Sequence, residues 1–153
     1  MTENQVTPDL CASEVMEHVP FVTRLIRAEM RRQGAPLLSM PQFRALAFIY
    51  RNPGESLSAV ADHLGVTLPT ASAITDRLVR HGLLARATDP KERRRITLTL
   101  TPDGLALYQR ARTATRSYVA GMLVDLTDTE LATVAEGIRL LGNAFRQRAM
   151  PRE

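Results

Sequence analysis

Residues 57–101 read LSAVADHLGVTLPTASAITDRLVRHGLLARATDPKERRRITLTLT, and this segment carries the clearest structural signals in the chain. A short helix is predicted over residues 58–64. Ser58 is a good N-cap for it, and Gly65 supplies the left-handed turn that ends it at little steric cost. A second helix follows after only two more residues, so the segment predicts a helix-turn-helix.

The second helix begins after Thr67, a good N-cap, with Pro69 in its first turn, where a missing N–H costs no hydrogen bond. It is expected to stop at Gly82. Its core-facing residues recur at helical spacing: Ala71, Ile74 and Leu78. Its outer face carries mostly small, hydroxyl-bearing or charged side chains: Leu68, Thr70, Ser72, Ala73, Thr75, Asp76 and Arg77. Short side chains would let the helix enter a DNA major groove, although a lone helix of this kind is more often simply solvated.

Two predicted strands, residues 83–87 and 96–100, enclose a basic loop. Ile96, Leu98 and Leu100 alternate with threonines, which is strand periodicity, and Pro90 breaks regular structure between the strands. The cations of the loop are Lys91, Arg93, Arg94 and Arg95. Such side chains can reach phosphates or a narrow minor groove, whereas an isolated basic loop is more often a solvated surface feature. Beside a helix-turn-helix, the hairpin favours a winged DNA-binding domain.

Residues 89–104, DPKERRRITLTLTPDG, resemble the wing of the MarR family of bacterial transcription regulators. The shared features are an acidic and arginine-rich tip, a hydrophobic strand, and Leu-Thr-x-x-Gly at the start of a long helix. Residues 57–66 and 78–86 are similar to the family's helix-turn-helix. The resemblance implies a homodimeric DNA-binding regulator, most often a repressor, that a small ligand releases from DNA.

Helices are expected on both sides of this segment. One begins near Ser13 and meets Pro20, which predicts a kink or a late start, and residues 39–42, SMPQ, form a capping box for the next. Thr101 caps a helix over about residues 102–126, and residues 127–130, TDTE, form a capping box for the last. The apolar stripe of that last helix comprises Leu131, Val134, Ile138, Leu141 and Phe145. The expected fold class is therefore mainly α with a small antiparallel β wing.

Three parts are expected along the chain. Residues 1–38 would form an N-terminal arm and a first dimerisation helix, residues 39–104 the winged helix-turn-helix domain, and residues 105–153 the C-terminal dimerisation helices. The small winged domain cannot cover the apolar faces of all the outer helices, so a second copy of the chain is the expected partner. A twofold dimer would place two recognition helices in major grooves roughly 34–36 Å apart, which predicts a near-palindromic operator.

Exposure and resemblance together assign the DNA contacts. The expected major-groove residues are Thr70, Ser72, Ala73 and Asp76, and the expected phosphate contacts are Thr67 and Arg77. The resemblance places Arg94 in the minor groove, oriented by Glu92, with Lys91, Arg93 and Arg95 adding charge. Asp76 has two interpretations, since it can accept from cytosine N4 or pair with Arg80 one turn later and touch no base.

The chain offers further candidates for a sensing site. The resemblance implies a small aromatic or anionic ligand, which arginines could hold: Arg24, Arg27, Arg44 and Arg86. For each of them an ordinary surface role is the commoner one. Cys11 raises the option of oxidant sensing, but its neighbourhood lacks tyrosines to hydrogen-bond a thiolate, which favours an ordinary thiol. The histidines are scattered and form no metal-ligand set, so no metal or cofactor is expected.

Composition limits the remaining functions. The chain has 153 residues and a net charge of +4, and residues 77–95 carry an excess of positive charge, with seven cations against two acidic residues. With one cysteine and no apolar run long enough to cross a membrane, we expect a cytoplasmic protein without a disulfide or a membrane partner. No phosphate-binding loop, activated nucleophile or carboxylate pair is present, so an enzyme is not expected. The alternative is a winged-helix protein–protein interaction module, against which the arginine-rich wing argues.

Overall fold

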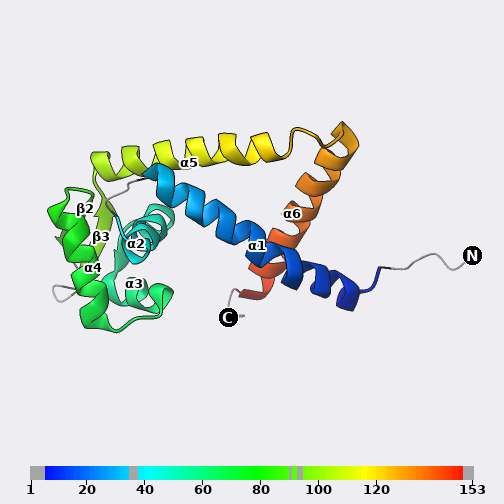
Figure 1. Ribbon diagram of the computed structural model, residues 1–153. Helices are drawn as coiled ribbons and strands as arrows, with labels where there is room; N and C mark the ends of the chain where they lie inside the picture. Colours follow the sequence, from blue (N-terminus) through cyan, green and yellow to red (C-terminus); the bar gives the residue numbers. More distant parts are fainter. Residues whose placement is uncertain (1–5, 35–37, 90, 93–94, 150–153) are drawn as a thin grey trace, which may run out of the picture. The chain divides into compact units, whose positions relative to one another are not determined.

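The computed structural model describes residues 6–34, 38–89, 91–92 and 95–149 (Figure 1). Within these residues the elements are, in chain order, α1 (Pro8–Gly34), α2 (Met40–Arg51), β1 (Glu55–Ser56), α3 (Leu57–Leu64), α4 (Leu68–Arg80), β2 (Leu84–Thr88), β3 (Ile96–Leu100), α5 (Pro102–Met122) and α6 (Asp128–Ala149). The prediction of a mainly helical protein with a small antiparallel wing is confirmed.

The chain divides into two compact units, Met1–Arg116 and Ser117–Glu153. The first contains α1 to α4, the sheet and most of α5, and the second contains the end of α5 and α6. Among the described helices, none combines the length and the apolar character that crossing a membrane requires.

The helix-turn-helix forms as predicted except at its first residue. Gly65 ends α3 with φ 69°, and Thr67 caps α4 by accepting a hydrogen bond from the Thr70 N–H at 3.4 Å. The predicted cap of α3 was wrong, because Ser56 rather than Ser58 accepts from the Ala59 N–H, at 3.2 Å. Ser56 ends β1, a short strand that the sequence analysis missed, and pairing of β1 with β3 holds its backbone extended.

The sheet has the order β1-β3-β2, and both pairings are antiparallel. The predicted strand at residues 96–100 is confirmed, and the strand before it lies one residue later than expected. Leu98 of the central strand is fully buried and lies opposite Arg86 of β2. The register therefore places Arg86 on the side of the sheet that faces the core.

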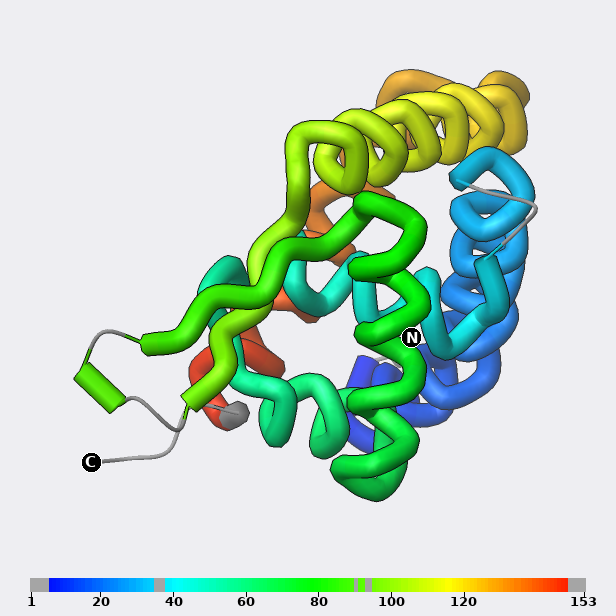
Figure 2. The backbone as a smooth tube through the Cα atoms, turned by 90° about the vertical axis from the view of Figure 1, so that its left-hand side faces the viewer, coloured from blue at the N-terminus to red at the C-terminus, as the bar shows by residue number. Residues whose placement is uncertain are grey.

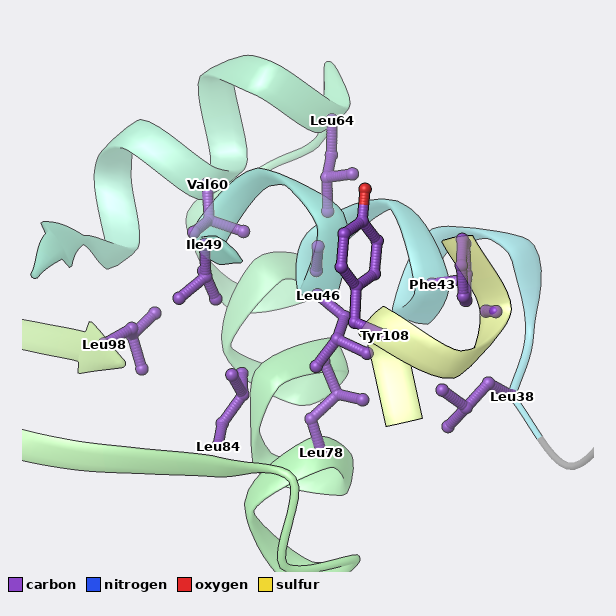
Figure 3. Packing of buried hydrophobic residues seen from close by; sticks show 12 residues of the cluster. Leu38, Phe43, Leu46, Ile49, Val60, Leu64, Leu78, Leu84, Leu98 and Tyr108 are labelled. Carbon is purple, nitrogen blue, oxygen red and sulfur yellow. The ribbon is translucent and has the colours of Figure 1, made fainter. Parts of the chain in front are cut away.

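A hydrophobic cluster joins the sheet to the helices of the winged domain (Figure 3). Leu46 and Ile49 of α2 pack with Val60 of α3, Leu78 of α4 and Tyr108 of α5. The Tyr108 ring lies 4.4 Å from the Tyr50 ring, measured between centroids. Burying a leucine such as Leu78 stabilises a fold by about 1.5–3 kcal/mol, so this core fixes α4 firmly against the sheet.

The outer helices differ from their predictions mainly at their ends. The capping boxes of α2 and α6 are present, but α5 ends at Met122, before residue 126. Helix α1 starts at Pro8, so Ser13 is not its cap, and the Ser13 hydroxyl donates to the Asp9 carbonyl within the helix. The helix continues through Pro20 without a late start. Because Pro20 and Met16 are exposed, water can take the hydrogen bond that the Met16 carbonyl loses.

Candidate nucleic-acid interface

The outer face of α4 is open to solvent beside the β2–β3 hairpin. Figure 2 shows α4 on the side toward the viewer, with the hairpin extending next to it. Thr67, Thr70, Ala73 and Arg77 are exposed, and their spacing of three and four residues aligns them in one stripe. The hydroxyls of Thr67 and Thr70 lie 2.9 Å apart. The first three residues of the stripe have short side chains, which a close approach of the helix to base-pair edges requires, and Arg77 is the one long side chain among the four.

Three other residues of α4 are engaged within the protein. Thr75 was expected on the outer face, which was wrong, because it is fully buried and its hydroxyl lies 3.0 Å from the Ala71 carbonyl oxygen. Ser72 and Asp76 are half-buried, and the Ser72 hydroxyl donates to Asp76 Oδ2 at 3.5 Å. The ion-pair partner of Asp76 is not Arg80 but Arg86 of β2, with Nη1 2.7 Å from Oδ1. Base contacts by Ser72 and Asp76 stay predictions.

Asp89 shapes the start of the wing loop. Its Oδ1 accepts hydrogen bonds from the backbone N–H groups of Lys91, at 2.8 Å, and Glu92, at 3.3 Å. The Arg95 N–H donates to the Glu92 carbonyl at 2.7 Å, and the Asp89 N–H donates to the Arg95 carbonyl at 2.9 Å. This role of Asp89 was not predicted from the sequence, although aspartates commonly form turns through such bonds.

The predicted wing cations fall into two groups. Lys91 and Arg95 are exposed, as is Glu92. Arg93 and Arg94 lie outside the described residues, and so does the expected pairing of Arg94 with Glu92. The part of the loop that is described offers two cations to solvent on the same domain as the α4 stripe.

Two of the four predicted ligand arginines come together around His63. Arg44 donates to the His63 carbonyl at 3.2 Å, and the His63 ring stacks on Phe48 with centroids 4.5 Å apart. Partial burial lowers the pKa of His63 below its ordinary value of 6.5, and the charges of Arg44, Arg51 and Arg27 lower it further. We call Arg27, Arg44, Arg51 and His63 the arginine–histidine cluster, of which the sequence analysis did not find Arg51 or His63.

The other two predicted ligand arginines have different neighbours. The Arg24 guanidinium lies 5.5 Å from the centroid of the Phe21 ring, and Arg86 pairs with Asp76. Cys11 is a free, exposed thiol on α1, and the preference for an ordinary thiol over a redox-sensing one stays a prediction. Among the described residues, no group of three or more histidine, cysteine, aspartate or glutamate side chains could hold a metal ion.

Comparisons with known proteins agree with this geometry. Residues 38–95 match the sequence model of the MarR family. The HTH-type transcriptional repressor Rv2887 of Mycobacterium tuberculosis is 29% identical over 123 residues, which cover 80% of this chain and 88% of the relative. The HTH-type transcriptional regulator YsmB of Bacillus subtilis is 24% identical over 144 residues, which cover 89% of this chain and 99% of the relative.

The solved structure of a MarR family protein from Bacillus stearothermophilus matches the fold with a TM-score of 0.75. The match covers 92% of this chain and 99% of the other, at 17% identity. Sequence and fold therefore lead to the same group of proteins, whose members regulate transcription by binding DNA and are not enzymes. The segment of this chain that holds the helix-turn-helix and the wing, residues 38–95, therefore matches the MarR family, and the relatives of the chain are named as HTH-type transcriptional regulators and repressors.

Proposed function

We propose that the protein is a homodimeric repressor that binds a near-palindromic operator and is released from it by a small anionic ligand. The observation that carries the DNA-binding part is the exposed α4 stripe beside a basic wing on one packed domain. The relative Rv2887, named as a transcriptional repressor, supports the direction of regulation. Because its target is chromosomal DNA, we place the protein in the cytoplasm.

In this proposal the two parts of the interface do different work. Thr70 and Ala73 meet base edges in the major groove, while Thr67 and Arg77 bind phosphates and set the position of the helix. The wing cations Lys91, Arg93, Arg94 and Arg95 contact the neighbouring backbone or minor groove, Arg94 being the one that enters the groove. Replacing Arg94 by alanine should lower operator affinity with little loss of folding, since position 94 falls in the sequence between β2 and β3 rather than within either strand. Unchanged affinity would refute this assignment.

The dimer is proposed from apolar side chains that the single chain leaves exposed. In α6 the stripe includes Ile138, which is 63% exposed, and Phe145, which is 65% exposed. In α1, Phe21 and Val22 are about half exposed as well. Contiguous apolar surfaces of this kind on a soluble protein usually mark an interface. A second copy would also supply the second recognition helix that a palindrome requires.

Sedimentation of an Ile138→Glu variant tests the dimer. A glutamate buried at the interface would weaken dimerisation at least about tenfold, because an unpaired charge is costly to desolvate. Since Ile138 is exposed within one chain, the variant should keep its helical content. Ala132→Glu, a change on the opposite side of α6, is the matched control and should stay dimeric. Equal dimerisation of both variants and the unaltered chain would refute α6 as the interface.

The ligand site is proposed at the arginine–histidine cluster. None of its three arginines forms an ion pair with a described residue, so their charges are available to an anion. The stacked Phe48 and His63 rings offer an aromatic surface beside them. Arg86 is less suited, because an anion would first have to displace Asp76.

Salicylate is a suitable probe for this site. A bound carboxylate would offset the arginine charges and raise the pKa of His63 toward its ordinary value, which imidazole NMR signals report. Arg44→Ala should abolish the response, and Arg116→Ala, a change of an exposed arginine on α5, should preserve it. An unchanged His63 titration at saturating salicylate would refute an anion site there.

A further inference from the structure

Arg86 occupies a position where the strand pattern calls for an apolar side chain. In the β2–β3 pairing, Leu84 lies opposite Leu100 and Arg86 lies opposite Leu98. Side chains two residues apart on a strand share a face, and Leu84 and Leu98 are both buried. The Arg86 side chain therefore starts on the same side of the sheet as Leu84 and Leu98, although Arg86 itself stays exposed, with 30% of its side chain accessible.

The guanidinium of Arg86 contacts two adjacent residues of α4, Thr75 and Asp76. Nη1 lies 2.7 Å from Asp76 Oδ1, and Nη2 donates to the Thr75 hydroxyl at 3.0 Å. Thr75 is fully buried, and its hydroxyl can in turn donate to the Ala71 carbonyl, 3.0 Å away, or to the Ser72 carbonyl, 3.1 Å away. Arg86 of the wing strand thus pairs with the Asp76 side chain of the recognition helix. Through the Thr75 hydroxyl it is also linked to the backbone of that helix.

This pairing also determines what Asp76 presents to DNA. An unpaired carboxylate on the recognition helix would repel phosphates and could accept a hydrogen bond from a cytosine amino group. Here one oxygen of Asp76 is paired with Arg86 and the other accepts from the Ser72 hydroxyl. The Asp76 side chain is 45% exposed and each carboxylate oxygen can accept a second hydrogen bond, so the ion pair orients Asp76 without saturating it. Turning the carboxylate toward a base would lengthen an ion pair of 2.7 Å.

We propose that Arg86 is a positioning residue that clamps the wing strand to the recognition helix and holds Asp76 away from the bases. Operator specificity then depends on the Arg86–Asp76 pair although neither side chain contacts a base. The effect is geometric, since the clamp fixes the angle between the two DNA-contacting parts, α4 and the wing. The inference rests on DNA binding by this chain and assigns a new role to two of its residues.

The test uses a duplex that the unaltered protein selects from a random-sequence pool, with a scrambled duplex of the same composition as reference. The specificity ratio is the dissociation constant for the scrambled duplex divided by that for the selected one. Arg86→Lys keeps the charge but cannot hold two acceptors in the fixed geometry of a guanidinium. We expect Arg86→Lys and Asp76→Asn each to lower the ratio by about three- to tenfold.

Because the two residues act as one unit, the double variant should be no worse than either single variant. Asp76→Glu, which lengthens the acid by one methylene, should restore part of the ratio in the Arg86→Lys background. Such a rescue would not occur if Arg86→Lys merely damaged the fold. Arg80→Lys is the matched control, since Arg80 is an exposed arginine of α4 and forms no ion pair within the described residues.

Three results would overturn the clamp. An unchanged ratio in Arg86→Lys would show that only the charge of Arg86 matters, as for a phosphate contact. If the double variant lowered the specificity ratio by the product of the two single reductions, the two residues would act independently. A changed preference at one base pair in Asp76→Asn alone would show that Asp76 reads a base. If the unaltered chain selects no duplex at all, the proposed DNA binding is wrong, and the clamp, which depends on it, is wrong as well. This result is distinguishable from the other three.

Discussion

Replacing Gly104 by alanine tests how closely the start of α5 approaches the junction between α4 and the wing. A Cβ at position 104 would lie 2.0 Å from the Leu83 carbonyl oxygen and 2.9 Å from the Leu83 carbonyl carbon. The same junction is held by Thr101, whose N–H donates to the Leu83 carbonyl at 3.1 Å and whose hydroxyl donates to the Gly82 carbonyl at 2.5 Å. Because the obstructing atoms are backbone, they cannot rotate away, and either α5 or residues 82–84 must move.

Two opposing effects set the magnitude of this change. Helix propensity alone favours alanine over glycine by up to about 1 kcal/mol. Forcing extra volume into a packed site costs about 1–3 kcal/mol, and a contact at 2.0 Å with backbone belongs at the upper end of that range. We therefore expect Gly104→Ala to lower the free energy of unfolding by about 2 kcal/mol.

Urea denaturation followed by circular dichroism measures this difference, at one fixed protein concentration because the protein is proposed to be a dimer. Gly121→Ala in the same helix is the control, since a Cβ at position 121 meets nothing within 4 Å among the described residues. It should be neutral or should stabilise by up to about 1 kcal/mol. A Gly104→Ala protein as stable as the Gly121→Ala protein would refute the close approach.

Two further outcomes follow from the caps and from His63. Ser56→Ala should lower the free energy of unfolding by about 1 kcal/mol, because Ser56 caps α3. Ser58→Ala should change the free energy of unfolding by less than about 0.5 kcal/mol. Equal losses in the two variants would contradict the cap at Ser56. The pKa of His63 is lowered in the folded protein, so the unfolded chain binds the proton more tightly than the folded one. The free energy of unfolding should therefore fall as the pH drops below 6.5 and should level off below the pKa of the folded state. Urea titrations at about pH 7.5 and pH 5.5 should show a smaller pH effect in His63→Gln. The same pH effect in both proteins would contradict the lowered pKa.

Local signals in the sequence predicted most of the fold. The capping residue of α4, Thr67, bonds to a backbone group three residues away, as does Ser39 in the capping box of α2. The alternation within β3 and the glycine turn at Gly65 are equally local. These features depend on residues close together in the chain, so a single sequence was enough to find them.

The features that were missed depend on contacts between distant residues. Ser56 became the cap of α3 because β1 pairs with β3, a contact across about forty residues that also bonds the Gly54 N–H to the Leu98 carbonyl at 2.9 Å. Helical spacing placed Thr75 outside the apolar stripe, but Thr75 is fully buried and its hydroxyl accepts a hydrogen bond from Arg86, eleven positions later. The pairing of Asp76 with Arg86 rather than with Arg80 has the same origin, since a neighbouring strand supplies the cation.

Binding to the protein's own upstream intergenic DNA tests the central claim most directly. The purified protein would be titrated against this DNA and against a scrambled duplex at several salt concentrations. We expect a footprint on a near-palindrome and an affinity that falls about a thousandfold between 50 and 200 mM salt, as for an interface with six or more phosphate contacts. Equal binding of both duplexes would contradict sequence-specific regulation from this site, and no binding at low salt would favour a winged-helix module that binds proteins instead.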